Sequence, residues 1–219
     1  MGYTKFTKQL VQGVIDKSKP KSVLDFGSAN DYETGNSRPP FISEWYLGQG
    51  IKYTCIDLAG DNGALQLDVS HPLYPWEHGA QYDLVVDSGF SEHVVQMDGY
   101  ETTAFHDGYI HSIYPTKVKD AELGFYNCWL NKWDLLRLGG IMVNENPLSG
   151  SWPGHGYHYY TPKFYDELEK IIDGVLLSYG EHPSSGNIVD GWNEWAIIIK
   201  TGHNFPTFEE FKKLPIQKA

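Results

Sequence analysis

Along this chain, segments whose apolar residues have a helix-like spacing alternate with segments that have a strand-like pattern. Apolar residues recur at intervals of three and four between Phe6 and Ile15, which predicts an amphipathic helix over about residues 4–17. Short apolar runs predict strands over residues 22–26, 53–58, 64–68, 82–87 and 141–143. Further helices are predicted near residues 41–47, 123–138, 161–172 and 208–213. This alternation is typical of a doubly wound, mostly parallel sheet.

The last two predicted strands, residues 175–179 and 194–200, have no helix between them, so we expect them to pair antiparallel. The predicted architecture is one α/β domain over residues 1–219, with a Rossmann-like, mostly parallel seven-stranded sheet that ends in this antiparallel pair. Residues 97–117 fit no periodic pattern, and we interpret them as an insertion that forms a lid or a surface loop.

Composition narrows the class of protein. The formal net charge is −11 and the longest basic cluster is Lys212-Lys213, which argues against a duplex nucleic-acid footprint. No apolar run is long enough to cross a bilayer, and the first residues contain no signal-peptide block. We therefore expect a cytoplasmic protein without a membrane partner, in which Cys55 and Cys128 are buried thiols.

Acidic residues follow successive predicted strands. Asp25, Asp57, Asp68 and Asp87 each stand at or beside the end of a strand, and Gly27 follows the first of them. Ligands of open α/β sheets bind beyond the carboxyl ends of the strands, and an acid after the second strand is typically where a ribose diol is held. Glycine lets the backbone approach a ligand closely. The pattern predicts a nucleoside-containing ligand at this edge.

At these residues the chain resembles the class I S-adenosylmethionine-dependent methyltransferases of the small-molecule branch, in the right order over about residues 22–200. The segments that carry the resemblance are Val23-Leu24-Asp25-Phe26-Gly27-Ser28, Tyr82-Asp83-Leu84-Val85-Val86, Glu92-His93-Val94, Leu136-Arg137-Leu138-Gly139-Gly140-Ile141-Met142-Val143 and His158-Tyr159-Tyr160-Thr161-Pro162-Lys163-Phe164.

The resemblance implies a cofactor, S-adenosyl-L-methionine, and a reaction, methyl transfer to a small molecule, sugar or modified metabolite. It implies that Asp57 holds the ribose hydroxyls and Asp68 lies beside the adenine. The implied cofactor-binding residues are Asp25, Gly27, Ser28, Ala29, Asp57, Leu58, Asp68, Asp87 and Ser88. In such an enzyme the protein mainly aligns the acceptor with the methyl group. The expected partner is a small-molecule methyl acceptor, and a homodimer is left open.

A general base is needed only where the acceptor loses a proton, and the candidates are the histidines His93, His155 and His158 and the acid Asp87. The histidines follow the fourth and fifth strands, in segments 88–93 and 146–160 that we expect to line the acceptor pocket beside the insertion. His106, Asp107 and His111 lack the spacing of helical metal ligands, so no metal is expected.

Two other classes of protein remain as alternatives. The family's first motif usually carries further glycines after the first, whereas here Ser28 and Ala29 follow and the next glycine is Gly35. This departure favours, as the alternative, a non-catalytic S-adenosylmethionine-binding or scaffold protein that keeps the fold. A nicotinamide-dependent oxidoreductase needs G-x-G-x-x-G, which residues 27–32 do not supply, and it ranks last.

Overall fold

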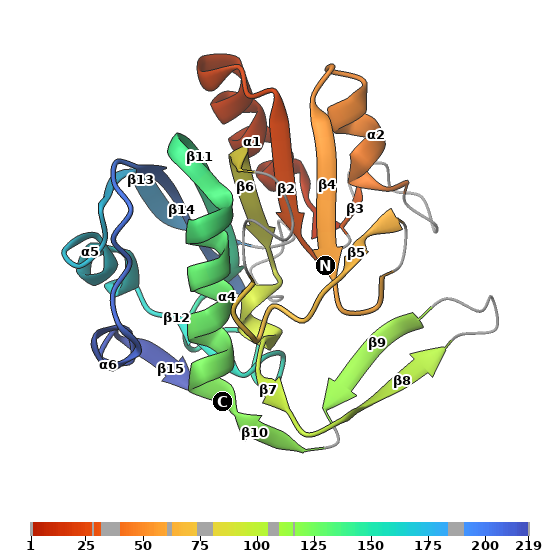
Figure 1. Cartoon of the computed structure of the whole chain (residues 1–219), viewed down its shortest axis with the longest axis vertical. Helices are drawn as coiled ribbons and strands as arrows, with labels where there is room; N and C mark the ends of the chain where they lie inside the picture. Colours follow the sequence, from red (N-terminus) through yellow and green to blue (C-terminus); the bar gives the residue numbers. More distant parts are fainter. Residues whose placement is uncertain are drawn as a thin grey trace.

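A computed structural model of the chain describes residues 2–27, 29–31, 40–60, 63–73, 81–104, 110–115, 117–183 and 191–218, with side chains except at 100–104 and 110–115. At its centre lies a seven-stranded sheet (Figure 1). In spatial order its strands are β13 (Gly174–Pro183), β14 (Trp192–Lys200), β11 (Leu136–Pro147), β6 (Tyr82–Ser88), β2 (Ser22–Phe26), β4 (Lys52–Asp57) and β5 (Leu65–Gln66).

The sheet is parallel from β11 to β5 and antiparallel at its other end. Strand β6 pairs parallel with both β11 and β2, and β4 pairs parallel with both β2 and β5. Strand β14 runs antiparallel to β11 and to β13. The predicted fold class, a mostly parallel sheet with a terminal antiparallel pair, is confirmed.

Helices cover both faces of the sheet because the central strands are apolar on both sides. Along β6, Leu84 and Val86 pack into one buried cluster while Val85, between them, packs into the other. Successive side chains of a strand point to opposite faces, which explains this division. One cluster lies under α1 (Lys5–Ser18) and α2 (Ile42–Leu47), and the other under α4 (Ala121–Leu135), α5 (Phe164–Glu169) and α6 (Phe208–Phe211).

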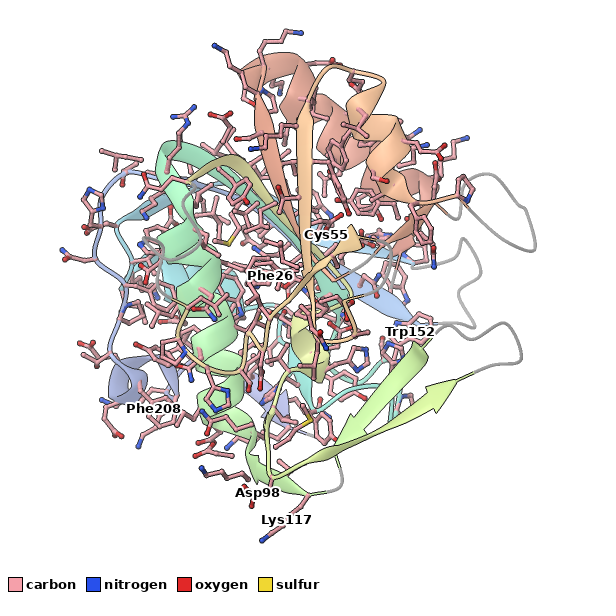
Figure 2. The ribbon with its side chains drawn as sticks, turned by 45° about the vertical axis from the view of Figure 1, so that its right-hand side comes forward. Phe26, Cys55, Asp98, Lys117, Trp152 and Phe208 are labelled. Carbon is pink, nitrogen blue, oxygen red and sulfur yellow. The ribbon has the colours of Figure 1, made fainter. Side chains whose placement is uncertain are left out.

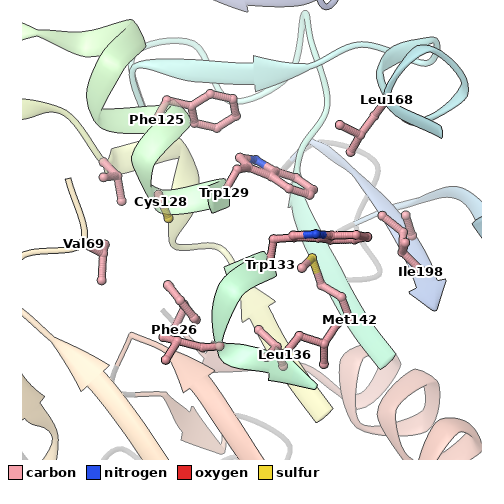
Figure 3. Close-up of a cluster of buried hydrophobic side chains, with 14 of the residues drawn as sticks. Phe26, Val69, Phe125, Cys128, Trp129, Trp133, Leu136, Met142, Leu168 and Ile198 are labelled. Atoms are coloured by element: carbon pink, nitrogen blue, oxygen red, sulfur yellow. The ribbon is translucent and has the colours of Figure 1, made fainter. Parts of the chain in front are cut away.

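The second cluster is built around two tryptophans of α4. Trp129 and Trp133 are each 1% exposed. In Figure 3, Trp133 lies between Trp129 and Met142 of β11, and Ile198 lies beyond the Trp133 ring. Burying one large apolar side chain contributes roughly 1.5–3 kcal/mol. This cluster therefore fixes α4 against the sheet, and α4 carries residues that reach the carboxyl edge.

Helix α1 agrees with the helix predicted for residues 4–17. It begins after Thr4, whose hydroxyl accepts from the Thr7 amide at 3.2 Å while the Thr4 amide donates to the Thr7 hydroxyl at 3.2 Å. This reciprocal capping satisfies donors that a helix start leaves free. The helix ends at Ser18, and the next residue, Lys19, has a φ of 50°.

The predicted boundary between α4 and β11 was wrong. We expected the helix to run to residue 138 and the strand to cover 141–143, but the helix ends at Leu135 and β11 begins at Leu136. The buried Lys200 ammonium donates to the carbonyls of Trp133 (2.7 Å) and Leu136 (2.9 Å). These tertiary bonds satisfy carbonyls at the helix end, which local sequence patterns do not reveal.

The predicted start of α5 and the third predicted strand also differ from the structure. We expected Thr161 to cap α5, but the Thr161 hydroxyl donates to the Pro215 carbonyl at 2.5 Å, and α5 begins at Phe164 without a side-chain cap. The strand predicted over 64–68 is reduced to the two residues of β5. Asp68 therefore lies in the connection after the strand.

The insertion contains an antiparallel hairpin that the sequence pattern did not predict. Strands β7 (Gln96–Met97) and β10 (Val118–Asp120) pair at its base, and β8 (Tyr100–Ala104) pairs with β9 (Ile110–Pro115) beyond them (Figure 1). Asp98 and Lys117 hold the base together: the Asp98 amide donates to the Lys117 carbonyl at 3.0 Å, and their charged groups are 3.8 Å apart (Figure 2).

Both cysteines are buried free thiols, as expected. In the described part of the chain, no helix combines the length and apolar character that crossing a membrane requires.

Candidate active site

The carboxyl ends of four neighbouring strands meet at one edge of the sheet. Phe26 pairs in register with both Ile56 and Asp87, and Ser88 pairs with Glu145. The residues that follow on β2, β4, β6 and β11 therefore lie side by side. Figure 1 shows that the β8–β9 hairpin projects from the same end of the molecule.

Two of the predicted cofactor residues stand at this edge on adjacent strands. Gly27 has a φ of 89°, a conformation that side chains disfavour, and its amide donates to the Ile56 carbonyl at 2.8 Å. Asp57 ends β4, and its Oδ1 accepts from the Ala59 amide at 2.9 Å. Leu58 beside it is half-buried. The glycine turn and the acid thus lie side by side at the carboxyl edge of the sheet.

Two further predicted cofactor residues, Ala29 after β2 and Ser88 at the end of β6, lie near this position. Ala29 is buried, and its carbonyl accepts from the Ile42 amide at 3.1 Å, which ties the turn to the start of α2. Ser28 lies outside the described residues. The Ser88 hydroxyl donates to the Gly2 carbonyl at 3.4 Å, so β1 (Gly2–Tyr3), which pairs with β3 (Asn30–Asp31), reaches the end of β6.

Asp68 forms a local turn beyond β5. Its Oδ1 accepts from the Ser70 amide at 2.9 Å, and its Oδ2 lies 3.2 Å from Nδ1 of His71. The side chain is 38% exposed, so solvent reaches the carboxylate.

Asp25 lies beneath the edge, inside the protein. It is fully buried, and Oδ2 accepts from the Tyr53 hydroxyl at 3.3 Å. Burial raises the pKa of Asp25 well above its usual range, and the hydrogen bonds from Tyr3 and Tyr53 oppose this shift. The structure gives this carboxyl group a role within the tyrosine cluster of α2 and β4 rather than on the open edge.

Asp87 is also internal, where it joins three elements. Its Oδ2 accepts from the fully buried Lys132 ammonium of α4 at 2.7 Å, and Lys132 also donates to the side chain of Asn144 at 2.9 Å. The Asp87 Oδ1 accepts from the amides of Phe90 (3.2 Å) and Ser91 (3.3 Å). Asp87 therefore fixes the turn that leads into the short 3-10 helix η3 (Ser91–His93).

Glu92, His93 and His155 meet beside this turn, and we call them the Glu92–His93–His155 cluster. Oε1 of Glu92 lies 3.4 Å from Nε2 of His93 and 3.8 Å from Nε2 of His155, and the two imidazole centroids are 4.8 Å apart. Glu92 is fully buried, whereas the histidine side chains are 40% and 45% exposed. Two of the three candidate histidines, His93 and His155, thus share one site.

The loop that carries His155 is held by the Tyr159 hydroxyl. That oxygen accepts from the amides of His155 (2.8 Å) and Gly156 (3.1 Å) and donates to the Trp152 carbonyl at 2.7 Å. Gly156 packs so tightly that a Cβ there would lie 2.8 Å from Cγ of Glu92. The next residue also binds this segment, because the Tyr157 amide donates to the Glu92 carbonyl at 2.8 Å.

Burial shifts the titration of all three groups toward their neutral forms. Burial, with the nearby Asp87 charge, raises the pKa of Glu92 to about 8. Burial, with the neighbouring His155, lowers the pKa of His93 to about 4, and burial also lowers the pKa of His155. Near neutral pH the cluster therefore offers two neutral imidazoles that can accept a proton or a cation.

His158, the third candidate base, does not join them. It lies in β12 (His158–Tyr160), which pairs with β15 (Ile216–Lys218), and its ring stacks on Phe125 with centroids 4.4 Å apart. It borders a cavity of about 20 Å³ near α6, room for about one water molecule. Burial lowers the pKa of His158 to about 4.

Glu92 and Tyr159 lie in the predicted pocket segments 88–93 and 146–160, but neither was predicted individually as a site residue. Glu92 had a signal, because it precedes a candidate base directly in Glu92-His93-Val94. Its burial depends on the packing of Gly156 from the next strand-end loop, which spacing along the chain does not reveal.

The fold is that of class I S-adenosylmethionine-dependent methyltransferases. No family model matches the sequence, and a search of curated proteins finds no match. Among solved structures, the chain is similar to 1,6-didemethyltoxoflavin-N1-methyltransferase of Burkholderia thailandensis, with a TM-score of 0.57 and 15% identity over 90% of this chain and 78% of that one. It is also similar to the N-methyltransferase NodS of Bradyrhizobium japonicum WM9, with a TM-score of 0.55 and 13% identity over 89% and 94% of the two chains.

Solved structures of both proteins hold S-adenosylhomocysteine, the demethylated form of the predicted cofactor. The fold also occurs in the [4+2]-cyclase SpnF, with a TM-score of 0.51 and 12% identity over 92% of this chain and 84% of that one. At these identities the similarity establishes the fold, and the function must be argued from the site.

Proposed function

We propose that this protein is an S-adenosylmethionine-dependent methyltransferase that acts on a small molecule. The observation that carries the proposal is the register of β2 and β4, which brings the positive-φ turn at Gly27 beside the carboxylate of Asp57 at the open edge of the sheet. A glycine turn lets the protein backbone approach a nucleoside closely, and an adjacent carboxylate accepts hydrogen bonds from the ribose diol.

The acceptor would lie beside Ser88 and the Glu92–His93–His155 cluster. Solvent reaches both histidines, and each has a pKa below that of a free imidazole, so the neutral, proton-accepting form dominates at neutral pH. The net charge of −11 favours a neutral or cationic acceptor over an anionic one.

Calorimetry with S-adenosylhomocysteine and, separately, with NAD tests the cofactor. We expect one molecule of S-adenosylhomocysteine per chain and no heat with NAD. Formation of S-adenosylhomocysteine from S-adenosylmethionine, followed by mass spectrometry over a panel of small amines and hydroxyl compounds, then tests transfer. A folded protein that does not bind S-adenosylhomocysteine would contradict the proposal.

A binding protein without transfer activity is the second candidate. It is supported by Ala29, a buried side chain where the first motif of the family usually has a further glycine. Tight S-adenosylhomocysteine binding without turnover on any member of the panel would favour this candidate.

A further inference from the structure

We infer that the Glu92–His93–His155 cluster is a binding site for a divalent first-row transition metal ion such as Zn²⁺. Among the residues that the structure describes, no other three His, Cys, Asp or Glu side chains bring ligand atoms together in this way; here the three atoms lie within 4.8 Å of one another. No metal was expected from the sequence, where the ligands considered were His106, Asp107 and His111 of the insertion. His106 and Asp107 of that set lie outside the described residues.

The distances suit a metal. Zn²⁺ binds imidazole nitrogen and carboxylate oxygen at about 2.0–2.2 Å, which places the donors of a tetrahedral site about 3.4 Å from one another. The Glu92 oxygen is 3.4 Å from one imidazole nitrogen and 3.8 Å from the other. All three donor atoms lie within 4.8 Å of one another, so the imidazoles must draw closer together when an ion binds.

Glu92 supplies an independent observation that points to a cation. It is fully buried, and neither carboxylate oxygen has a hydrogen-bond partner among the described residues. A buried polar group without a partner is costly, and such a group in a folded protein calls for an explanation such as a missing ion. The carboxylate is aimed at two imidazole nitrogens that also have no closer partner in the described structure, so a cation between them would satisfy all three groups.

The ligand set indicates the class of metal. Two imidazoles and one carboxylate suit Zn²⁺, Co²⁺ or Fe²⁺ better than Mg²⁺ or Ca²⁺, which prefer oxygen ligands. Three protein ligands leave coordination positions open, as in catalytic rather than structural zinc sites. The exposed sides of His93 and His155 place those positions toward solvent, where an oxygen or nitrogen atom of an acceptor can coordinate. With an ion bound, these imidazole nitrogens are ligands and no longer accept a proton, and the ion takes over activation of the acceptor. This last step rests on the proposed function, whereas metal binding itself does not.

Calorimetry with Zn²⁺ alone, on the untagged full chain after chelator treatment and dialysis, tests the site. We expect one ion per chain, and at least a tenfold loss of affinity in Glu92→Gln, His93→Ala and His155→Ala, each checked for folding by circular dichroism. Glu92→Gln keeps the size and shape of the buried side chain, removes its ability to ionise, and is not expected to unfold the protein. Co²⁺ gives a second readout, because direct ligation by imidazole produces visible absorption bands that each variant should weaken.

His71→Ala is the matched control. His71 is an exposed histidine 3.2 Å from a carboxylate, Asp68, but no third ligand joins this pair in the described structure. Its loss should leave Zn²⁺ affinity unchanged. The proposal is overturned if the wild type binds neither ion, or if binding survives all three cluster variants. Both outcomes are independent of S-adenosylhomocysteine binding, so failure here and failure of the proposed function are distinguishable.

Discussion

At the scale of single residues, Asp57 accepts a hydrogen bond within its own turn and is also the residue proposed to bind the ligand. We predict that Asp57→Ala weakens S-adenosylhomocysteine binding by about 1.5–3 kcal/mol, the range for hydrogen bonds to a charged group. The Ala59 amide, which donates to Oδ1 at 2.9 Å, also loses its partner in this variant. Asp57→Asn keeps that acceptor and removes the charge, so calorimetry on both variants separates ligand contact from turn geometry. Full affinity in both would assign Asp57 to the turn alone.

Lys132 is the buried cation on which Asp87 depends. Both side chains are fully buried and their charged atoms are 2.7 Å apart, so Lys132→Met leaves an uncompensated buried carboxylate. We predict a loss of about 3–5 kcal/mol in the free energy of unfolding, measured with urea. Adding Asp87→Asn should recover part of this loss. Lys17→Met, the same change at an exposed position of α1, is the control. Equal stabilities of the Lys132 and Lys17 variants would show that the pair contributes nothing.

At the scale of elements, the antiparallel pair β13–β14 brings acids together. Glu194 of β14 is 1% exposed and pairs in register with Glu181, and burial together with Glu181 and Asp166 raises the pKa of Glu194 to about 8. Between about pH 4.5 and 8 the unfolded chain ionises this group and the folded protein does not. The contribution of Glu194 to the free energy of unfolding is therefore fully present below its unfolded pKa and is lost as the pH rises toward 8.

Glu194→Gln removes this titration. We predict that the free energy of unfolding of the wild type falls relative to Glu194→Gln by about 1 kcal/mol per pH unit over that window. Urea titrations at pH 5, 6, 7 and 8 measure the difference, with Glu44→Gln at an exposed site of α2 as the control. A difference that stays constant with pH would contradict the raised pKa.

Sequence patterns predicted elements well where a period was sustained, and poorly where a tertiary contact decides the boundary. The apolar repeat from Phe6 to Ile15 located α1 closely, and Leu84-Val85-Val86 identified β6 as a strand buried on both faces. The end of α4 was missed because Lys200, 65 or so positions along the chain, caps it. The β8–β9 hairpin was missed because its strands have no alternation that marks a buried face.

The same division holds for positions at the edge of the sheet. The places of Asp57 and Gly27 were predictable, since Asp57 ends a strand and Gly27 follows one, while their role in cofactor binding stays a prediction. Asp25 and Asp87 satisfy the same rule, yet both are fully buried, Asp87 against Lys132 and Asp25 beside Tyr53. A strand's last residues point alternately to its two faces, and an acid one position before the edge turns into the core. Position along a strand therefore indicates the edge but not which acids reach it.

At the scale of the whole molecule, ligand binding must appear as stability. A ligand that binds only the folded state stabilises it by about 2.7 kcal/mol at a hundredfold excess over its Kd. For a domain of about this length each kcal/mol shifts Tm by roughly 2–4 °C, so we predict that saturating S-adenosylhomocysteine raises Tm by roughly 5–10 °C. The measurement is a thermal scan of the full chain in the presence of a chelator, so that metal bound at the Glu92–His93–His155 cluster does not contribute. NAD at the same concentration is the control and should give no shift, because residues 27–32 lack the glycines that a dinucleotide pyrophosphate requires. A shift of Tm with NAD and none with S-adenosylhomocysteine would contradict the proposed cofactor and favour a nicotinamide-dependent protein.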